Sequence, residues 1–68
     1  MNAEEIRELT VEEIRDQLDD TREELMKLRF QTATGELTDT NRLRIVRRQI
    51  ARLMTVLHEK ENELEGEA

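Results

Sequence analysis

The chain has 68 residues, of which 35% are hydrophobic and 41% are charged, and its formal net charge is -6. Phe30 is the only aromatic residue, so we expect one domain over residues 1–68 with a thin core and marginal stability. Cysteine is absent, which excludes disulfides and thiolate metal sites and fits a reducing cytoplasmic compartment. No apolar run approaches the roughly 20 residues that cross a bilayer, and the N-terminus does not resemble a signal peptide. We therefore expect a soluble chain without membrane insertion.

Two capping boxes mark the predicted starts of the first two helices. A short helix over about residues 3–9 is predicted from the capping-box spacing of Asn2-Ala3-Glu4-Glu5. A long helix over about 11–33 follows the stronger box Thr10-Val11-Glu12-Glu13. Its apolar residues repeat at steps of three and four, with Thr21 in the one missing place, which is typical of a heptad seam. These residues are Val11, Ile14, Leu18, Leu25 and Leu28.

A second long helix is predicted over about residues 40–62, after a loop over about 34–39 that contains Gly35. Residues of N-cap type precede this helix: Thr38, Asp39, Thr40 and Asn41. Its seam repeats the same steps, with Lys60 in the gap, through Leu43, Val46, Ile50, Leu53, Leu57 and Leu64. Two seams joined by about six residues must fold onto each other, because neither helix can bury its stripe alone. The predicted fold class is all-α, an antiparallel hairpin of two long helices with a short N-terminal helix and an acidic tail over 63–68.

Charge is strongly segregated along the chain. Residues 1–26 carry a charge of -7, residues 27–52 carry +5 and residues 53–68 carry -4. The hairpin should therefore be a rod with a basic half at the loop and an acidic half at the other end, where like charges cost a little stability. A partner feels the local field and not the net charge, so the low pI does not exclude a polyanionic ligand.

The second long helix carries an acid-free cationic surface from Thr40 to His58. At about 100° per residue, Arg44, Arg48 and Arg52 face away from the seam, with Arg47 on one shoulder. Ordinary solvated surface is one interpretation. However, such a surface normally mixes Glu with Lys, whereas an arginine-only face suits forked contacts with phosphate oxygens. Ile45 and Val56 lie on the other shoulder and need a cover, for which we favour the short first helix over a protein neighbour.

Three stretches of the chain resemble a known family. They are Leu28-Arg29-Phe30-Gln31 with Gly35-Glu36-Leu37, then Arg47-Arg48-Gln49-Ile50-Ala51-Arg52, then Thr55-Val56-Leu57. These residues are similar to those of the large-ribosomal-subunit protein L-twenty-nine family, from the first helix to about Lys60. The resemblance implies a non-enzymatic, cytoplasmic ribosomal protein that binds large-subunit ribosomal RNA near the exit of the peptide tunnel. It also implies protein L-twenty-three as a neighbour and tunnel-exit factors as further partners.

Carried over by position, the resemblance implies an RNA-facing set on both sides of the loop. The set is Arg29, Gln31, Arg44, Arg47, Arg48, Arg52 and Thr55. One departure is the acidity of the other half, from Asp16 to Glu24 and in the tail, because members of this family are commonly basic. We expect that acidic half to point away from RNA, toward solvent or a docking factor. With no exposed aromatic residues expected, recognition should use RNA shape and phosphates and not base stacking.

Two other classes of function are compatible with parts of the sequence. A coiled-coil adaptor that binds a protein through the hairpin faces is the stronger alternative, although it does not require an acid-free arginine run. The stretch from Ile14 to Leu25 loosely resembles the first helix of helical chorismate mutases, but the third helix and the lysine between helices are lacking. His58 has no ligand or nucleophile at suitable spacing. We therefore predict no catalytic residues, no metal and no cofactor.

Overall fold

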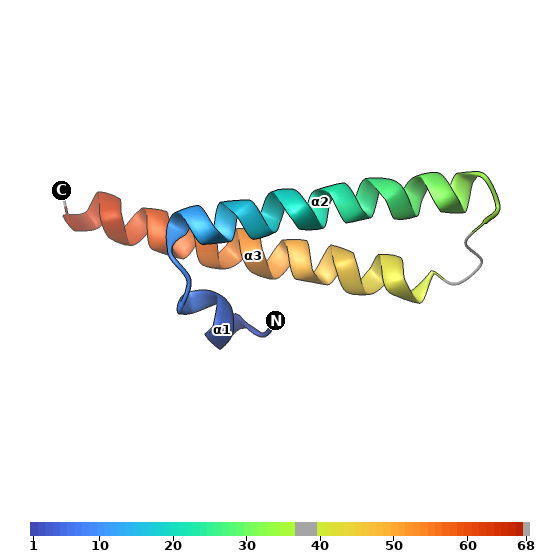
Figure 1. Ribbon diagram of the computed structural model, residues 1–68. Coiled ribbons are helices and arrows are strands. Elements are labelled where there is room, and N and C mark those ends of the chain that lie inside the picture. Colours follow the sequence, from blue (N-terminus) through green and yellow to red (C-terminus); the bar gives the residue numbers. More distant parts are fainter. Residues whose placement is uncertain (37–39, 68) are drawn as a thin grey trace.

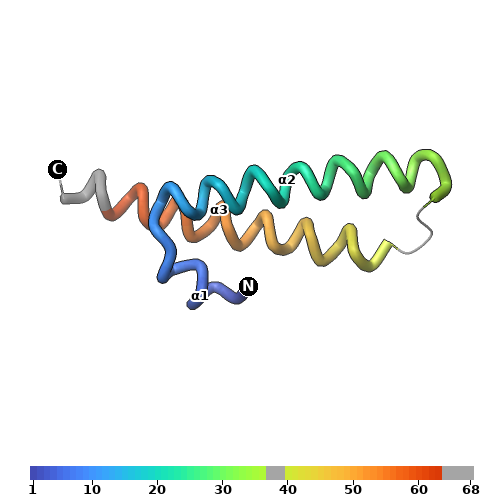
Figure 2. The backbone as a smooth tube through the Cα atoms, viewed as in Figure 1, coloured from blue at the N-terminus to red at the C-terminus, as the bar shows by residue number. Residues whose placement is uncertain are grey.

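The computed structural model describes residues 1–36 and 40–67, with side chains placed for 1–36 and 40–63. Its helices are α1 (Ala3–Arg7), α2 (Val11–Ala33) and α3 (Asn41–Glu67). The two long helices lie side by side and antiparallel, and α1 folds back against α3 near the start of α2 (Figure 1). The backbone trace shows this end and the loop end at opposite ends of an elongated molecule (Figure 2), with principal extents of 50 × 17 × 14 Å. The predicted all-α hairpin with a short first helix is confirmed.

Side-chain caps fix the starts of α1 and α2 where the sequence placed them. The Asn2 Oδ1 atom accepts a hydrogen bond from the Glu5 backbone N–H at 2.9 Å. In front of α2, the Glu13 N–H donates to the Thr10 hydroxyl oxygen and the Thr10 N–H donates to a Glu13 carboxylate oxygen, both at 3.2 Å. Each such cap satisfies backbone donors that have no partner inside the helix and stabilises it by about 1 kcal/mol.

A glycine ends α2 in the left-handed conformation. Gly35 has φ of 81°, a region that residues with a Cβ rarely adopt. The Glu36 N–H donates to the Gln31 carbonyl at 2.9 Å, and the Gly35 N–H donates to the Thr32 carbonyl at 3.2 Å. This pair of bonds is a Schellman motif, which satisfies carbonyls at the end of the helix and turns the chain sharply. The motif places the backbone of Glu36 beside the last turn of α2.

The buried core lies at the α1 end of the hairpin. Five side chains from all three helices form one cluster with at most 5% exposure: Ile6, Ile14, Leu18, Leu53 and Val56. Nearer the loop, Val46 is buried, whereas the seam residues Leu25, Leu28 and Leu43 are only half-buried. Packing of the two long helices alone leaves those positions partly open to water. The loop half of the molecule therefore contributes less hydrophobic stabilisation than the α1 half.

The short helix covers only one of the two shoulder residues. Val56 is 1% exposed and packs in the cluster with Ile6, as predicted, but Ile45 remains 48% exposed, so its predicted cover is wrong. Eleven helical residues separate the two positions along α3, a distance of about 16 Å. Helix α1 has five residues and spans about 7 Å. It is too short to cover both positions.

Helix α3 is longer than the sequence pattern predicted. Its start at Asn41 agrees within one residue, and the first helical hydrogen bond runs from the Arg44 N–H to the Thr40 carbonyl at 3.2 Å. It continues to Glu67, so the expected end near residue 62 and the separate tail from 63 are wrong. The added stretch contains no proline, and its Glu and Leu residues favour helix more than Gly66 disfavours it. The predicted cap positions Thr38 and Asp39, and most of the predicted loop, lie outside the described residues.

None of the described helices is long and apolar enough to span a bilayer.

Candidate RNA-binding surface

Three arginines in the first half of α3 share one exposed surface. Arg44, Arg47 and Arg48 line a shallow depression together with Thr40, Leu43 and the small residue Ala51. No acidic residue occurs in the first turn of α3, and none of the described residues that border this depression is acidic. Within the described residues, none of these three arginines forms an ion pair or a side-chain hydrogen bond. Their guanidinium groups are therefore available to a ligand; together they are called the arginine surface below.

The two arginines that flank this surface are engaged within the chain. Both Nε and Nη2 of Arg42 donate to one carboxylate oxygen of Glu24 on α2, the Nε contact being 3.0 Å. Arg52 donates from Nη1 to the Met1 carbonyl at 3.4 Å, which draws it toward the N-terminal segment. The outward ridge predicted through Arg52 thus bends toward the N-terminus at that residue. Within the described part of the chain Arg52 uses one of its five donors, so the guanidinium can still contact a ligand.

The remaining predicted residues lie at two other places. Thr55 is exposed on α3, but its hydroxyl donates to the Ala51 carbonyl at 2.8 Å, so the oxygen is left as an acceptor. Arg29 and Gln31 are exposed near the end of α2, at the loop end of the hairpin. Gln31 borders a second depression and does not line the one formed by the arginine surface. The structure therefore brings three of the seven predicted residues into one depression and distributes the others around it.

At the acidic end of the rod, ion pairs neutralise part of the negative charge. Arg7 Nε lies 3.4 Å from a carboxylate oxygen of Glu59, and Arg15 Nη2 lies 3.0 Å from one of Glu61. The predicted crowding of like charges there is offset, because helix α1 and the start of α2 supply cations. All four side chains are substantially exposed, so each pair is worth only tenths of a kcal/mol. The acidic end is thus a solvated surface that includes paired charges.

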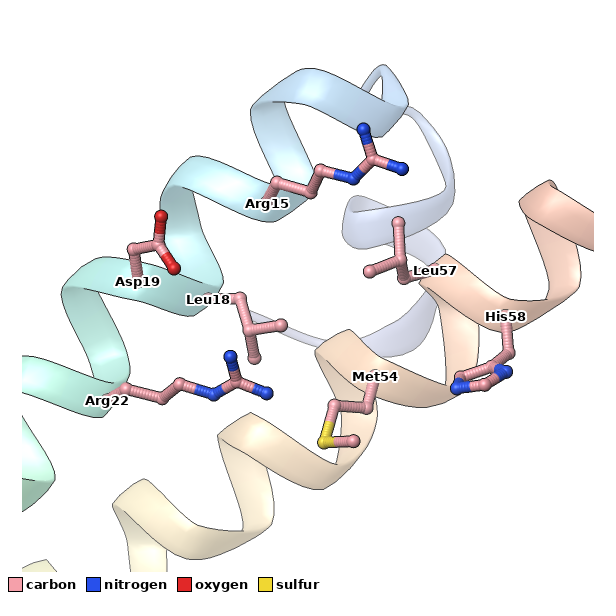
Figure 3. A pocket seen from close by; sticks show the side chains of 7 residues that line it. All are labelled: Arg15, Leu18, Asp19, Arg22, Met54, Leu57 and His58. Carbon is pink, nitrogen blue, oxygen red and sulfur yellow. The ribbon is translucent and has the colours of Figure 1, made fainter.

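A groove between α2 and α3 shows no arrangement for catalysis. Figure 3 shows Arg22 pointing across this groove toward Met54, while Asp19 points away and His58 lies at the edge on α3. His58 has no hydrogen-bond partner among the described residues. The described part of the chain also contains no group of three or more His, Cys, Asp or Glu side chains that could hold a metal ion.

Sequence reasoning missed an exposed apolar pair on α2. Phe30 is 68% exposed and Met26 is 71% exposed, so the expectation of a surface without exposed aromatics is wrong. The heptad spacing could have predicted the exposure of Phe30, because this residue does not belong to the 3, 4 pattern of seam residues, which ends at Leu28. A helical residue off the seam can be buried only by a third element, and α1 packs on α3 far from this place.

Comparison with known proteins decides the family. The model of the family described as "Ribosomal L29 protein" matches residues 4–60. The chain belongs to this family. Three proteins named "Large ribosomal subunit protein uL29" are similar to it. The one from Mycolicibacterium vanbaalenii is 60% identical over 57 residues, which are 84% of this chain and 74% of that protein. The Rubrobacter xylanophilus protein is 57% identical over 63 residues, covering 93% of this chain and 94% of its own length. The Staphylococcus aureus protein is 56% identical over 63 residues, covering 93% and 91%.

Membership of the ribosomal L29 family confirms the resemblance seen in the sequence. It places the chain among ribosomal structural proteins and not among enzymes, so the mutase-like stretch of α2 has no catalytic meaning. The family match extends across α1, α2 and most of α3, and it includes every residue of the arginine surface. Which residues contact RNA stays a prediction.

Proposed function

We propose that this chain is a structural constituent of the large ribosomal subunit that binds large-subunit ribosomal RNA near the exit of the peptide tunnel. The similar proteins are named as large-ribosomal-subunit proteins, which supports the incorporation of this chain into the large subunit. The observation that carries the RNA contact is the arginine surface, where Arg44, Arg47 and Arg48 are adjacent, exposed and unpaired within the described residues. Such a surface inside a chain of net charge -6 favours a polyanion as its partner.

The geometry suits contacts with the sugar-phosphate backbone. Arg44 and Arg48 are four residues apart, so they lie about 6 Å apart along one line of α3, with Arg47 beside them. Each planar guanidinium can donate two parallel hydrogen bonds to a phosphate, which a lysine ammonium cannot do. Ala51 offers little bulk where the RNA backbone would approach. Binding would release counterions from the phosphates, so the affinity should depend strongly on salt.

The other predicted residues extend this contact in two directions. Arg52 has free guanidinium donors toward the middle of α3, and the Thr55 oxygen can accept a hydrogen bond from a ribose 2′-hydroxyl. At the loop end, Arg29 and Gln31 would contact a neighbouring part of the same RNA. The acidic half of the rod would then face away from RNA, because carboxylates repel phosphates. Protein L-twenty-three and tunnel-exit factors are the proposed neighbours on the surfaces that RNA leaves free.

The decisive test compares two triple variants of equal charge. One changes Arg44, Arg47 and Arg48 to alanine; the matched control changes Arg7, Arg15 and Arg22 to alanine. Both lower the net charge from -6 to -9. Affinity for a large-subunit rRNA fragment would be measured across a salt series for the wild type and both variants. We expect a wild-type slope equivalent to roughly three to five phosphates, reduced by about two to three in the first variant only.

Other results would contradict the assignment. Equal losses in both triple variants would show that net charge matters and the arginine surface does not. Binding of the wild type without any salt dependence, or no binding by a folded chain, would favour the coiled-coil adaptor instead. Family membership argues against that alternative, and so does the absence of acids among the described residues that line the depression around Arg47.

The position in the subunit can be tested separately, because the chain has no cysteine. Met54→Cys would carry a single tethered hydroxyl-radical source at the groove between α2 and α3, about two helical turns from Arg47. After incorporation into large subunits, we expect cleavage of rRNA that surrounds the tunnel exit. Cleavage confined to a distant part of the subunit would refute the proposed location.

A further inference from the structure

Among the residues whose side chains the structure describes, the most exposed large apolar ones form a pair on the last turns of α2. Met26 is 71% exposed and Phe30 is 68% exposed, and their four-residue spacing places them next to each other on one face. Together with Lys27, Gln31 and Glu36 they line a shallow depression. Scattered exposed apolar residues are common, but here the only Phe, Tyr or Trp ring of the chain stands at the surface beside a methionine.

The residues around this ring are held in place by the helix end. The Schellman motif ties the Glu36 backbone N–H to the Gln31 carbonyl at 2.9 Å, so the backbone of both residues is fixed at the border of the depression. Gln31 also accepts a hydrogen bond at its carbonyl from the Thr34 hydroxyl at 3.1 Å. The site therefore exists before any ligand binds, which lowers the ordering cost of binding.

The charge around the pair indicates what covers it. Residues 27–52 carry +5. The depression itself is lined by one cation, Lys27, and one acid, Glu36, and Arg29 beside Phe30 adds an exposed cation without an ion pair among the described residues. Lys27 has only a loose contact, 3.8 Å, with Glu23 one turn earlier. Two apolar side chains are far less than the roughly 800 Å² that each partner buries in a stable protein interface. A single flat apolar ligand attached to phosphates fits this surface better than a protein does.

We infer that Phe30 is a stacking platform for one unpaired base of the bound RNA, and that Met26 flanks the base. This inference rests on the proposed RNA binding and adds a base contact to the phosphate contacts of the arginine surface. Every base has a π-face that can stack on an aromatic ring, and single-stranded loops and bulges of folded RNA present such bases. Gln31 and Glu36 line the depression, and the side chains of both can accept hydrogen bonds from an exocyclic amine, so we expect the site to prefer an amine-bearing base to uracil. Arg29 would contact the phosphate of the same nucleotide.

The first test is the binding of aromatic, aliphatic and truncated variants to the large-subunit rRNA fragment. Phe30→Ala should weaken binding by roughly 5- to 150-fold, the loss measured for single base–aromatic stacks. Phe30→Leu should lose most of the same affinity, because it retains an apolar side chain but has no ring. The slope of log affinity against log salt should stay at the wild-type value, since no phosphate contact is removed. Ile45→Ala is the matched control, because it truncates another exposed apolar residue, and it should bind like the wild type.

The second test uses fluorescence, because the chain contains no tryptophan or tyrosine. A tryptophan at position 30, Phe30→Trp, keeps a stacking ring and should retain the affinity. Its emission should be strongly quenched when RNA binds, whereas the emission of Met54→Trp should change little.

The outcomes separate this inference from the proposed function. RNA binding that depends on the arginine surface but is unchanged in Phe30→Ala would overturn the stacking site and leave the proposed function intact. Loss in Phe30→Ala with full recovery in Phe30→Leu, and no quenching in Phe30→Trp, would also overturn it and would indicate an apolar contact that does not involve stacking. No RNA binding by the folded wild-type chain would refute both.

Discussion

Replacing Leu53 by alanine should remove a large part of the stability of this small protein. Leu53 is 0% exposed and packs in the cluster that joins α1, α2 and α3. The change deletes three carbon atoms, a transfer loss of about 2.4 kcal/mol at about 0.8 kcal/mol for each. The cavity left behind adds to this, because neighbours from three helices cannot all collapse into it. We expect a loss of about 3 kcal/mol in the free energy of unfolding.

A loss of this size is severe for a chain of 68 residues. Domains of this length have total stabilities of roughly 3 to 10 kcal/mol, and each kcal/mol shifts the melting temperature by about 4–8 °C. Urea unfolding and thermal unfolding of Leu53→Ala, followed by far-ultraviolet circular dichroism, would measure the change. We expect a melting temperature lower by roughly 12–24 °C.

The matched control is Leu43→Ala, which removes the same atoms from the loop half of the same seam. Leu43 is only half-buried, so its truncation should cost about 1 kcal/mol. Equal losses in the two variants would refute the conclusion that the core is concentrated at the α1 end. A negligible loss in Leu53→Ala would refute the packing of the three helices around this residue.

Three smaller changes test the helix ends and the surface charges, and urea unfolding measures each of them. Gly35→Ala should destabilise the hairpin by about 1 kcal/mol, because φ of 81° is strained for a residue with a Cβ although there is room for the added atom. An equal loss of stability in Gly35→Asn would argue against backbone strain as the cause, since asparagine tolerates the left-handed conformation better. Thr10→Ala should cost about 1 kcal/mol through the lost capping box, and Thr10→Ser should restore most of it. Glu61→Gln should cost under about 0.5 kcal/mol, and the difference should vanish in high salt, because its pair with Arg15 is exposed.

The helical architecture could be predicted because its determinants are local. The capping box at Thr10 and the glycine at position 35 act within one helical turn, so they mark the bounds of α2 in any fold that contains it. The far end of α3 has no comparable marker, and the prediction ended that helix five residues too early. The end of a helix is harder to predict where no stop signal is present, and between Asn62 and Gly66 the chain has neither proline nor glycine.

The candidate site was predicted in part for the same reason. The positions of Arg44, Arg47 and Arg48 on one side of α3 follow from helical periodicity alone. Whether each arginine is available to a ligand depends on residues far away in the chain: Glu24 engages Arg42, and the Met1 carbonyl engages Arg52. No spacing rule within one helix contains these contacts.

The sequence by itself determined the fold class, the heptad seam and the separation of a cationic from an acidic half, because each depends on periodicity, capping or charge order along one chain. Only the tertiary structure decided where the core is deep and which side chains remain exposed. Burial requires atoms from at least two sides, and the five-residue α1 supplies a third side at Val56 but not at Ile45. The same limit leaves Phe30 exposed beside the cationic half, at the place where we expect an RNA base to lie.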